Sequence, residues 1–288
     1  MIETMTNSYQ KILNQIEKLS REGIFGKVAL ASAEEYEDMP YDISRLSKFI
    51  RELSLEIFSI DSDETQIVSI FWQMLLVVYR DSKKNDPNVS LAYLNSFVKD
   101  YPGTSQTAMT YRLNSLTHAI FAFNSVADSK EMLLMWQQSA KLFLEYSEFL
   151  NGLLGYLIIA WKCAQNKPIN LNVFKSTYAQ KAHQFEQLTN GDDGAFYLFH
   201  RIIIPSLRNA IAHGQYWLDY EERRVRYVDG KDKMEKELPL DEFIVTCMIG
   251  SKLPKSYIAA LSTIIIWEFG TEVQKMSLPQ NLIKLLAN

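Results

Sequence analysis

Three polar residues near position 210 have the types and the spacing that chemistry at a phosphate group needs. The segment SLRNAIAHGQYW at 206–217 contains Arg208, Asn209 and His213. A histidine gains and loses a proton near neutral pH, so it can act as a base or an acid. An arginine guanidinium binds two phosphate oxygens through parallel hydrogen bonds. We therefore treat Arg208, Asn209 and His213 as candidate catalytic residues.

The reaction that these types fit is the cleavage of RNA without a metal ion. It needs a base for the 2′-hydroxyl, an acid for the leaving 5′-oxygen and a cation on the pentacoordinate phosphate. A single histidine does not fill both proton-transfer roles comfortably. Two copies of the motif facing each other across a two-fold axis would fill them, because such an interface brings the same residues from both subunits together. The chemistry thus predicts a homodimer.

The spacing also places these residues at the end of a helix. Asn209 and His213 are four residues apart and share a helix face, whereas Arg208 and His213 are separated by about 140° around the axis. Gly214 follows directly and predicts a left-handed C-terminal cap. His213 would then lie beside the unpaired carbonyls at the negative end of the helix dipole. That environment favours the protonated imidazole.

The flanking segments must position this helix end. Apolar periodicity predicts a helix over 195–213, and Pro205 inside it predicts a kink or a restart near Ser206. After Gly214, aromatic and β-branched residues nearly alternate around a polar turn, which predicts a β-hairpin over about 215–229. The following KDKMEKELP is expected to be a charged loop.

The rest of the chain is predicted to be helical. Of its 288 residues, 47% are apolar and 22% are charged, and glycine and proline are sparse, which favours helices over sheets. The fold class expected is all-α: a helical bundle with one small β-hairpin after the motif helix, plus an N-terminal helical region. Helices are expected over 7–20, 42–59 (with Asp42 as N-cap), 128–163 (one long helix or two broken near Asn151-Gly152), 171–189, 239–250, 255–269 and 278–287.

The sequence around NSVADSK suggests two regions, 1–126 and 127–288, and leaves the role of the first open. The most apolar stretches, 152–161 and 258–267, are about half the ~20 residues that span a bilayer. They are expected to be buried core helices, and no membrane association is predicted.

Charge and cysteine content exclude several function classes. The net charge of −4 provides no global attraction to nucleic acid or to an anionic membrane, so any RNA contact must be local. Cys163 and Cys247 have no CxxC spacing and no neighbouring Cys/His cluster, which argues against a zinc site or a disulfide framework. With no signal-peptide pattern at the N-terminus, a cytoplasmic protein without cofactor or metal is expected.

The string R-N-x-x-x-H at Arg208–His213 resembles the signature of the HEPN superfamily. The setting is similar too: an apolar helix precedes the string, Gly214 follows it, and a hairpin comes next. The resemblance is sharp over roughly 196–229 and only architectural over the rest of 127–288. It implies a helical bundle, often dimeric. Many such proteins are metal-independent endoribonucleases of toxin–antitoxin, abortive-infection and CRISPR-associated systems.

The resemblance also implies roles for the three residues. Arg208 would bind the scissile phosphate, His213 would transfer the proton, and Asn209 would orient the histidine or the phosphate. An RNA substrate, a homodimeric partner and an antitoxin or regulatory protein would follow from the toxin or phage-defence setting. In one HEPN subgroup a tyrosine two residues after the histidine accepts a nucleotide. Tyr216 stands one residue too far along the chain, so that role is not carried over.

Other interpretations stay open. Many HEPN-like domains are catalytically silent dimerisation or partner-binding modules, and Arg208 could simply pair with a carboxylate while His213 caps the last carbonyls. A helical scaffold with a fortuitous motif is the third alternative.

Five further arginine and histidine residues are weaker candidates for the functional site. The hairpin residues Arg223, Arg224 and Arg226 could hold an RNA backbone, or they could form a solvated charged surface with Glu221 and Glu222. Arg112 and His118 fit a looser version of the motif spacing, but no Asn follows that arginine and no Gly follows that histidine. We do not assign Arg112 and His118 to the site, and we keep Arg223, Arg224 and Arg226 as weak candidates for RNA binding.

Overall fold

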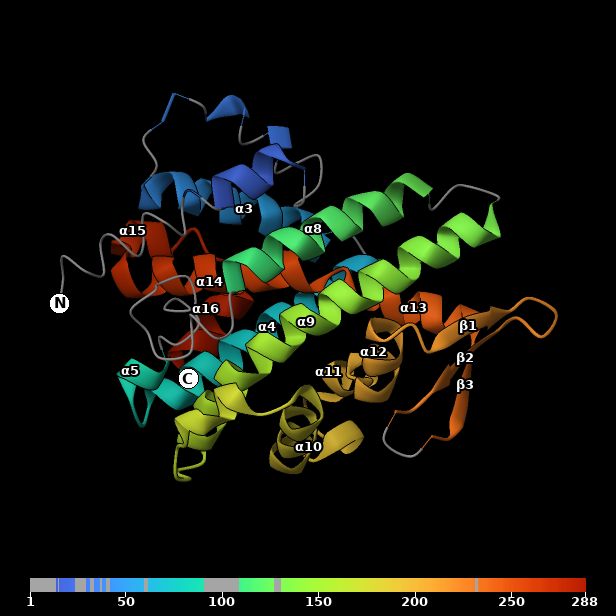
Figure 1. Cartoon of the computed structure of the whole chain (residues 1–288). Helices are drawn as coiled ribbons and strands as arrows, with labels where there is room; N and C mark the ends of the chain where they lie inside the picture. Colours follow the sequence, from blue (N-terminus) through green and yellow to red (C-terminus); the bar gives the residue numbers. More distant parts are fainter. Residues whose placement is uncertain are drawn as a thin grey trace. The chain divides into compact units, whose positions relative to one another are not determined.

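The protein is mostly α-helical and carries one small antiparallel sheet, as the sequence predicts (Figure 1). The computed structural model describes residues 42–59, 62–90, 109–126, 131–230 and 233–288, and before them residues 14, 16–23, 30–31, 34–36 and 38–39. Of the helix expected over 7–20, residues 14 and 16–20 are described, and they are helical.

Contacts divide the chain into two compact units. Unit 1 contains Met1–Ser105, Ile159–Ile169 and Leu253–Asn288. Unit 2 contains Gln106–Ile158 and Asn170–Lys252. This division differs from the one expected from the sequence, in which 1–126 stands apart from 127–288. Residues 127–130, at the expected boundary, lie outside the described residues.

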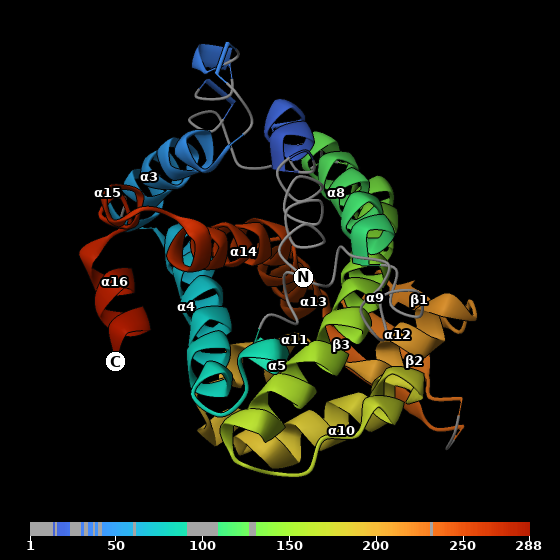
Figure 2. The same ribbon diagram turned by 90° about the vertical axis from the view of Figure 1, so that its left-hand side faces the viewer.

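Unit 1 contains one strongly apolar helix, α14 (Leu253–Phe269), on which several of its other helices pack. Helices α3 (Ile43–Ser59) and α4 (Asp63–Lys83) lie against α14 (Figure 2). The indole Nε1 of Trp72 donates a hydrogen bond of 3.1 Å to Thr263 Oγ1 on α14. The smaller helices of this unit are α5 (Pro87–Ser90), α15 (Glu272–Lys275) and α16 (Gln280–Ala287).

Side-chain caps start the two long N-terminal helices of unit 1. Asp42 Oδ1 accepts hydrogen bonds from the backbone N–H groups of Ser44 (2.8 Å) and Arg45 (3.1 Å), which confirms the expected cap. Ser62 and Thr65 form a capping box at the start of α4. These bonds satisfy backbone donors that the first helical turn leaves unpaired.

Unit 2 is organised around most of the long helix α9 (Met132–Ala164). The helix continues through Asn151 and Gly152, so the first of the two alternatives, one long helix, is observed. Its length and composition would suffice to cross a membrane, yet 78% of its most apolar window is buried inside the structure. That burial is what the core helix of a folded unit shows. Aromatic contacts join this helix to the rest of the unit: the ring of its Phe143 packs on that of Phe243, with centroids 5.5 Å apart.

The remaining helices of unit 2 surround this one. They are α8 (Met109–Val126), α10 (Tyr178–Thr189), α11 (Tyr197–Ile202), α12 (Pro205–Ala212) and α13 (Leu240–Gly250), with short 3₁₀ turns at Leu171–Lys175 and Gly191–Asp193. The expected restart near Ser206 is observed: α11 ends at Ile202, and Pro205 is the first residue of α12. Proline suits that position because the first helical N–H has no intrahelical partner.

The sheet follows α12 directly. Strand β1 (Tyr216–Asp219) pairs antiparallel with β2 (Arg224–Val228), which confirms the predicted hairpin. The expectation of a charged loop afterwards is wrong in part, because β3 (Glu235–Pro239) pairs with β2 as a third strand. Val225 is fully buried, and the sheet contacts α12 and α13 (Figure 1).

The contact between α13 and α9 gives a stability prediction. A Cβ added at Gly250 would lie 2.6 Å from Cδ1 of the Tyr146 ring, which is fully buried. We expect Gly250→Ala to lower the free energy of unfolding by about 1–3 kcal/mol, because the ring has little room to shift. Urea denaturation measures this change. In the control Gly230→Ala, the new Cβ would meet only Gln215 Oε1 at 3.6 Å, and stability should stay within about 0.5 kcal/mol. Equal effects of the two substitutions would contradict the packing argument.

Candidate functional site

The motif helix α12 ends as the sequence predicts, with Gly214 in the left-handed conformation at φ 67°. The N–H of Gly214 donates to Ile211 O (3.1 Å), and the N–H of Gln215 donates to Ala210 O (2.8 Å). This pair of bonds is a Schellman motif, which satisfies two of the last carbonyls of the helix. It also turns the chain into β1, so the helix end and the hairpin form one local structure.

His213 is the C-cap residue of α12, and its backbone N–H donates to Asn209 O (3.0 Å). Its side chain is exposed. No hydrogen bond or ion pair joins its imidazole to another residue in the part of the chain that the structure describes. The side chains of His213 and Arg208 therefore share no hydrogen bond, although Arg208 lies in α12 and His213 caps it. The imidazole is open to solvent and to any partner molecule.

Arg208, by contrast, is held by internal hydrogen bonds. Its Nε donates to Glu148 Oε1 (2.7 Å), and its Nη2 donates to the same oxygen. Its Nη1 donates to Asn209 Oδ1 (3.0 Å). The side chain is 25% exposed. The motif asparagine therefore orients the arginine in this structure, and no hydrogen bond joins its side chain to the imidazole of His213.

Glu148, on α9, is a site residue that the sequence reasoning missed. Its Oε2 accepts from Arg112 Nη1 on α8 (2.8 Å), and its backbone carbonyl accepts from the same nitrogen. One carboxylate thus pairs with two guanidinium groups, from α8 and from α12. Arg112, set aside in the sequence because its motif was incomplete, belongs to the same cluster as Arg208. Its neighbour in that loose motif, His118, has no hydrogen bond or ion pair with these residues in the described part of the chain.

A buried lysine completes this cluster. Lys181, on α10, is only 3% exposed, and its Nζ donates to both the carbonyl and the Oδ1 of Asn151, each at 2.9 Å. Burial, and to a smaller extent the positive charge of Arg112, lower the pKa of Lys181 to about 8, while Glu148 opposes the shift. Glu145, one turn before Glu148, has a pKa raised mainly by burial. We call Arg112, Glu148, Lys181 and Arg208 the charged cluster.

One signal in the sequence could have located the α9 side of this cluster. Glu145, Glu148 and Asn151 recur every three residues in a helix that is otherwise largely apolar. Residues three and four apart lie on one helix face, so they form a polar stripe. A polar stripe on a buried helix must be paired. The sequence alone does not say which of the chain's basic residues pair with it.

The hairpin arginines are all engaged with carboxylates. Arg223 Nη2 donates to Asp241 (3.1 Å), and Arg224 Nη1 donates to Glu237 (2.6 Å). Arg226 pairs with four acidic side chains in and around the sheet, namely those of Asp219, Glu222, Glu235 and Glu237. These ion pairs favour the solvated charged surface over the RNA-binding alternative, because an RNA phosphate would have to compete with them.

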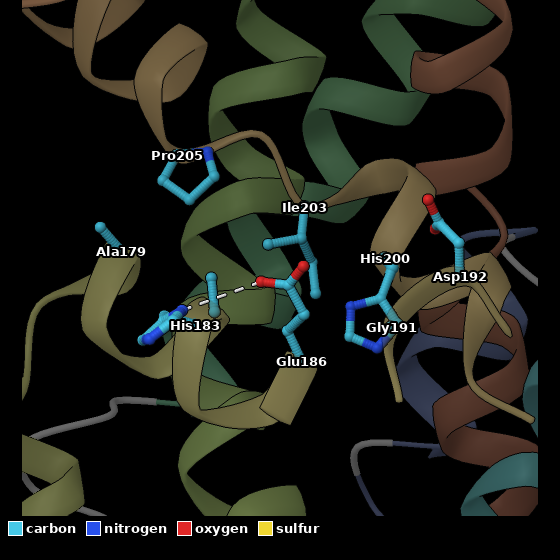
Figure 3. A pocket seen from close by; sticks show the side chains of 9 residues that line it. Ala179, His183, Glu186, Gly191, Asp192, His200, Ile203 and Pro205 are labelled. Atoms are coloured by element: carbon cyan, nitrogen blue, oxygen red, sulfur yellow. Dashed lines mark ion pairs between the residues drawn. The ribbon is translucent and has the colours of Figure 1, made fainter. Parts of the chain in front are cut away.

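A separate pocket of about 300 Å³ lies between α10, α11 and the start of α12 (Figure 3). His183 Nδ1 faces Glu186 across 3.9 Å, and His200 lies on the other side of the pocket (Figure 3). The His200 ring stacks on Phe185, and its Nε2 is 2.7 Å from Thr189 Oγ1. Burial lowers the pKa of His200, so its neutral form is favoured. Neither Arg208 nor His213 lines this pocket.

No group of three or more His, Cys, Asp or Glu side chains that could hold a metal ion is found among the described residues. Both cysteines are buried free thiols. Comparisons of the chain with protein-family models, with curated proteins and with solved structures find no match.

The charged cluster predicts that the stability of the protein depends strongly on the carboxylate of Glu148. Glu148→Gln keeps the shape of the side chain but leaves two partly buried guanidinium groups without a counter-charge. We expect the free energy of unfolding to fall by about 1–3 kcal/mol, the range for hydrogen bonds to charged groups. Urea denaturation at neutral pH measures it. The control is Glu186→Gln, whose side chain is 63% exposed, and it should change stability by less than about 0.5 kcal/mol. A Glu148→Gln protein as stable as this control would contradict the pairing.

Proposed function

We propose that the protein is a metal-independent endoribonuclease of the HEPN type, with Arg208, Asn209 and His213 as its catalytic residues. Arg208 binds the scissile phosphate, Asn209 orients Arg208, and His213 transfers the proton. The resemblance of the R-N-x-x-x-H string to that superfamily supports this proposal. The structure supports it with a helix end that presents the exposed imidazole of His213 to solvent.

The observation that carries the proposal is the contrast within α12 between a fixed cation and an accessible imidazole. Arg208 is held by Glu148 and Asn209 in one orientation, so little conformational entropy is lost when it binds a phosphate. His213 lies exposed beside the last carbonyls of the helix. A structural histidine would more commonly be buried in internal hydrogen bonds. A proton-transfer group must reach its substrate, and His213 meets that requirement.

The reaction would follow the general scheme of RNA transesterification. A base removes the proton of the 2′-hydroxyl as its oxygen attacks phosphorus, and the bond from phosphorus to the 5′-oxygen breaks as an acid protonates that oxygen. The products are a 2′,3′-cyclic phosphate and a 5′-hydroxyl. Arg208 stabilises the charge on the pentacoordinate phosphate. His213 of one subunit acts as base and the His213 of a second copy acts as acid, which makes a homodimer part of the proposal.

The biological setting that we propose is a cytoplasmic toxin or phage-defence system, in which an antitoxin or another regulatory protein restrains cleavage. The exposed Trp217 lies on β1, four residues beyond His213, and provides apolar surface beside the helix end for such a contact or for the second subunit.

A second candidate function is a catalytically silent HEPN-like module that dimerises or binds a partner. One observation favours it: the guanidinium of Arg208 is already paired with a carboxylate, as in the structural alternative for the motif. In an active enzyme, Arg208 must contact the phosphate through N–H groups that Glu148 does not occupy. The two functions are separated by an assay of cleavage.

Purified protein is expected to cleave single-stranded RNA in the presence of EDTA. His213→Ala and Arg208→Ala should each lower the rate by about 100-fold or more, because proton transfer and phosphate charge stabilisation are lost separately. Gel analysis of a labelled RNA measures the rate and identifies the cyclic phosphate. Circular dichroism and thermal unfolding verify that each variant is folded.

The matched control is His183→Ala, which removes an exposed histidine from the same unit. It should leave the rate within about twofold, because His183 belongs to the separate pocket. Equal residual cleavage in the wild type and in both motif variants would indicate a contaminating nuclease and would overturn the proposal. A strict monomer in sedimentation would overturn its dimeric part.

A further inference from the structure

The charged cluster holds three cations and one carboxylate, and the nearby carboxylate of Glu145, whose charge also interacts with Arg112, still leaves one positive charge in excess. Arg112, Lys181 and Arg208 come from three different helices, and both arginines pair with the single carboxylate of Glu148. All of these side chains are at least three-quarters buried. Desolvated positive charge in excess is unfavourable unless an anion approaches it. The imbalance therefore points to a ligand of negative charge.

We propose that Arg112 and Lys181 form, with Arg208, a binding site for a phosphate-type oxyanion. The anion site itself does not depend on the ribonuclease function proposed above. Only the identification of the anion as a backbone phosphate of RNA rests on that function. In that role Arg112 and Lys181 bind the phosphate next to the scissile one and so fix the register of the strand. Free inorganic phosphate has the same chemistry and is the alternative source.

The arginine geometry leaves donors for such an anion. Arg112 uses Nη1 for both of its bonds to Glu148. No other bond of its guanidinium is found within the described residues, so Nε and Nη2 remain to grip two oxygens of one phosphate side by side. Arg208 directs Nε and Nη2 at a single oxygen of Glu148. The carboxylate thus holds two guanidinium groups close together.

Lys181 supplies the third cation. Its ammonium group has three N–H donors, and the two bonds to Asn151 occupy two of them. Its pKa of about 8 reflects burial first and Arg112 second, and Glu148 is the one acidic group that opposes the shift. A bound phosphate would add negative charge beside the amine and favour its protonated form. The pKa of Lys181 is therefore expected to rise when the site is occupied.

The test measures binding without cleavage. The probe is a fluorescein-labelled single-stranded DNA oligonucleotide, which lacks the 2′-hydroxyl, with inorganic phosphate as competitor. Arg112→Gln should weaken oligonucleotide binding by about tenfold and reduce the slope of log affinity against log salt by about one, as expected for one lost phosphate contact. Fluorescence anisotropy measures both quantities.

The matched control is Arg201→Gln, which removes the same charge from an exposed position on α11. It should change affinity by less than about twofold. If Arg112→Gln does not fold, Arg112→Lys keeps the charge beside Glu148 but loses the two-pronged donor, and it should still weaken binding by several-fold. Equal losses in the Arg112 and Arg201 variants, or no binding of either probe by the wild type, would overturn the proposal.

Nuclear magnetic resonance of the Lys181 side chain provides a second readout. Saturating inorganic phosphate or oligonucleotide should raise its pKa above the value near 8, and no rise with either would contradict the site. Binding by inorganic phosphate that the oligonucleotide cannot displace would assign the site to a free anion instead of to RNA.

Failure of this site and failure of the proposed function give different results. A His213→Ala protein that loses cleavage but binds the oligonucleotide like the wild type agrees with both the ribonuclease function and the anion site. Binding that depends on Arg112 in a protein that cleaves nothing would remove the ribonuclease and leave the anion site. If the Arg112→Gln protein cleaves RNA with an unchanged KM, the anion site is ruled out and the ribonuclease function stands.

Discussion

The carboxylate of Glu148 is the interaction on which the candidate site depends. It lies on α9, accepts from an arginine of α8 and from an arginine of α12, and so ties three helices of unit 2 together. Two guanidinium groups at such close range would repel each other without a shared counter-ion. The same carboxylate therefore stabilises the packing and sets the orientation of Arg208. A substitution of Glu148 would therefore change both the packing of the three helices and the orientation of Arg208.

The parts of the structure that could be predicted from the sequence are those with local causes. Gly214 ends α12 in the left-handed conformation because only a residue without a Cβ enters it freely, and Pro205 starts the same helix because of its fixed φ. The hairpin followed from alternation within one short stretch. The third strand escaped prediction because Glu235, Lys236 and Glu237 show no apolar alternation, and its position depends on pairing with β2.

Apart from the polar stripe on α9, the charged cluster could not be predicted, because its members are distant in sequence. Glu148 is 36 residues from Arg112 and 60 from Arg208, and Asn151 is 30 from Lys181. Nothing in the local sequence of Arg112 distinguishes it from a surface arginine. The motif at Arg208–His213 was visible because its residues are adjacent on one helix. Its partners from α8, α9 and α10 were determined only by how those helices pack.

The discontinuous make-up of unit 1 has a consequence for the order in which the chain is synthesised. Unit 1 requires Leu253–Asn288, which includes its apolar helix α14, whereas every segment of unit 2 precedes Leu253. Domains generally fold as units while the ribosome still extends the chain. Unit 2 would therefore be complete on the nascent chain before α14 of unit 1 is synthesised. It contains the candidate-site residues Arg112, Glu148, Lys181, Arg208 and His213. A messenger RNA truncated after the codon for Lys252 would therefore still encode every residue of the candidate site.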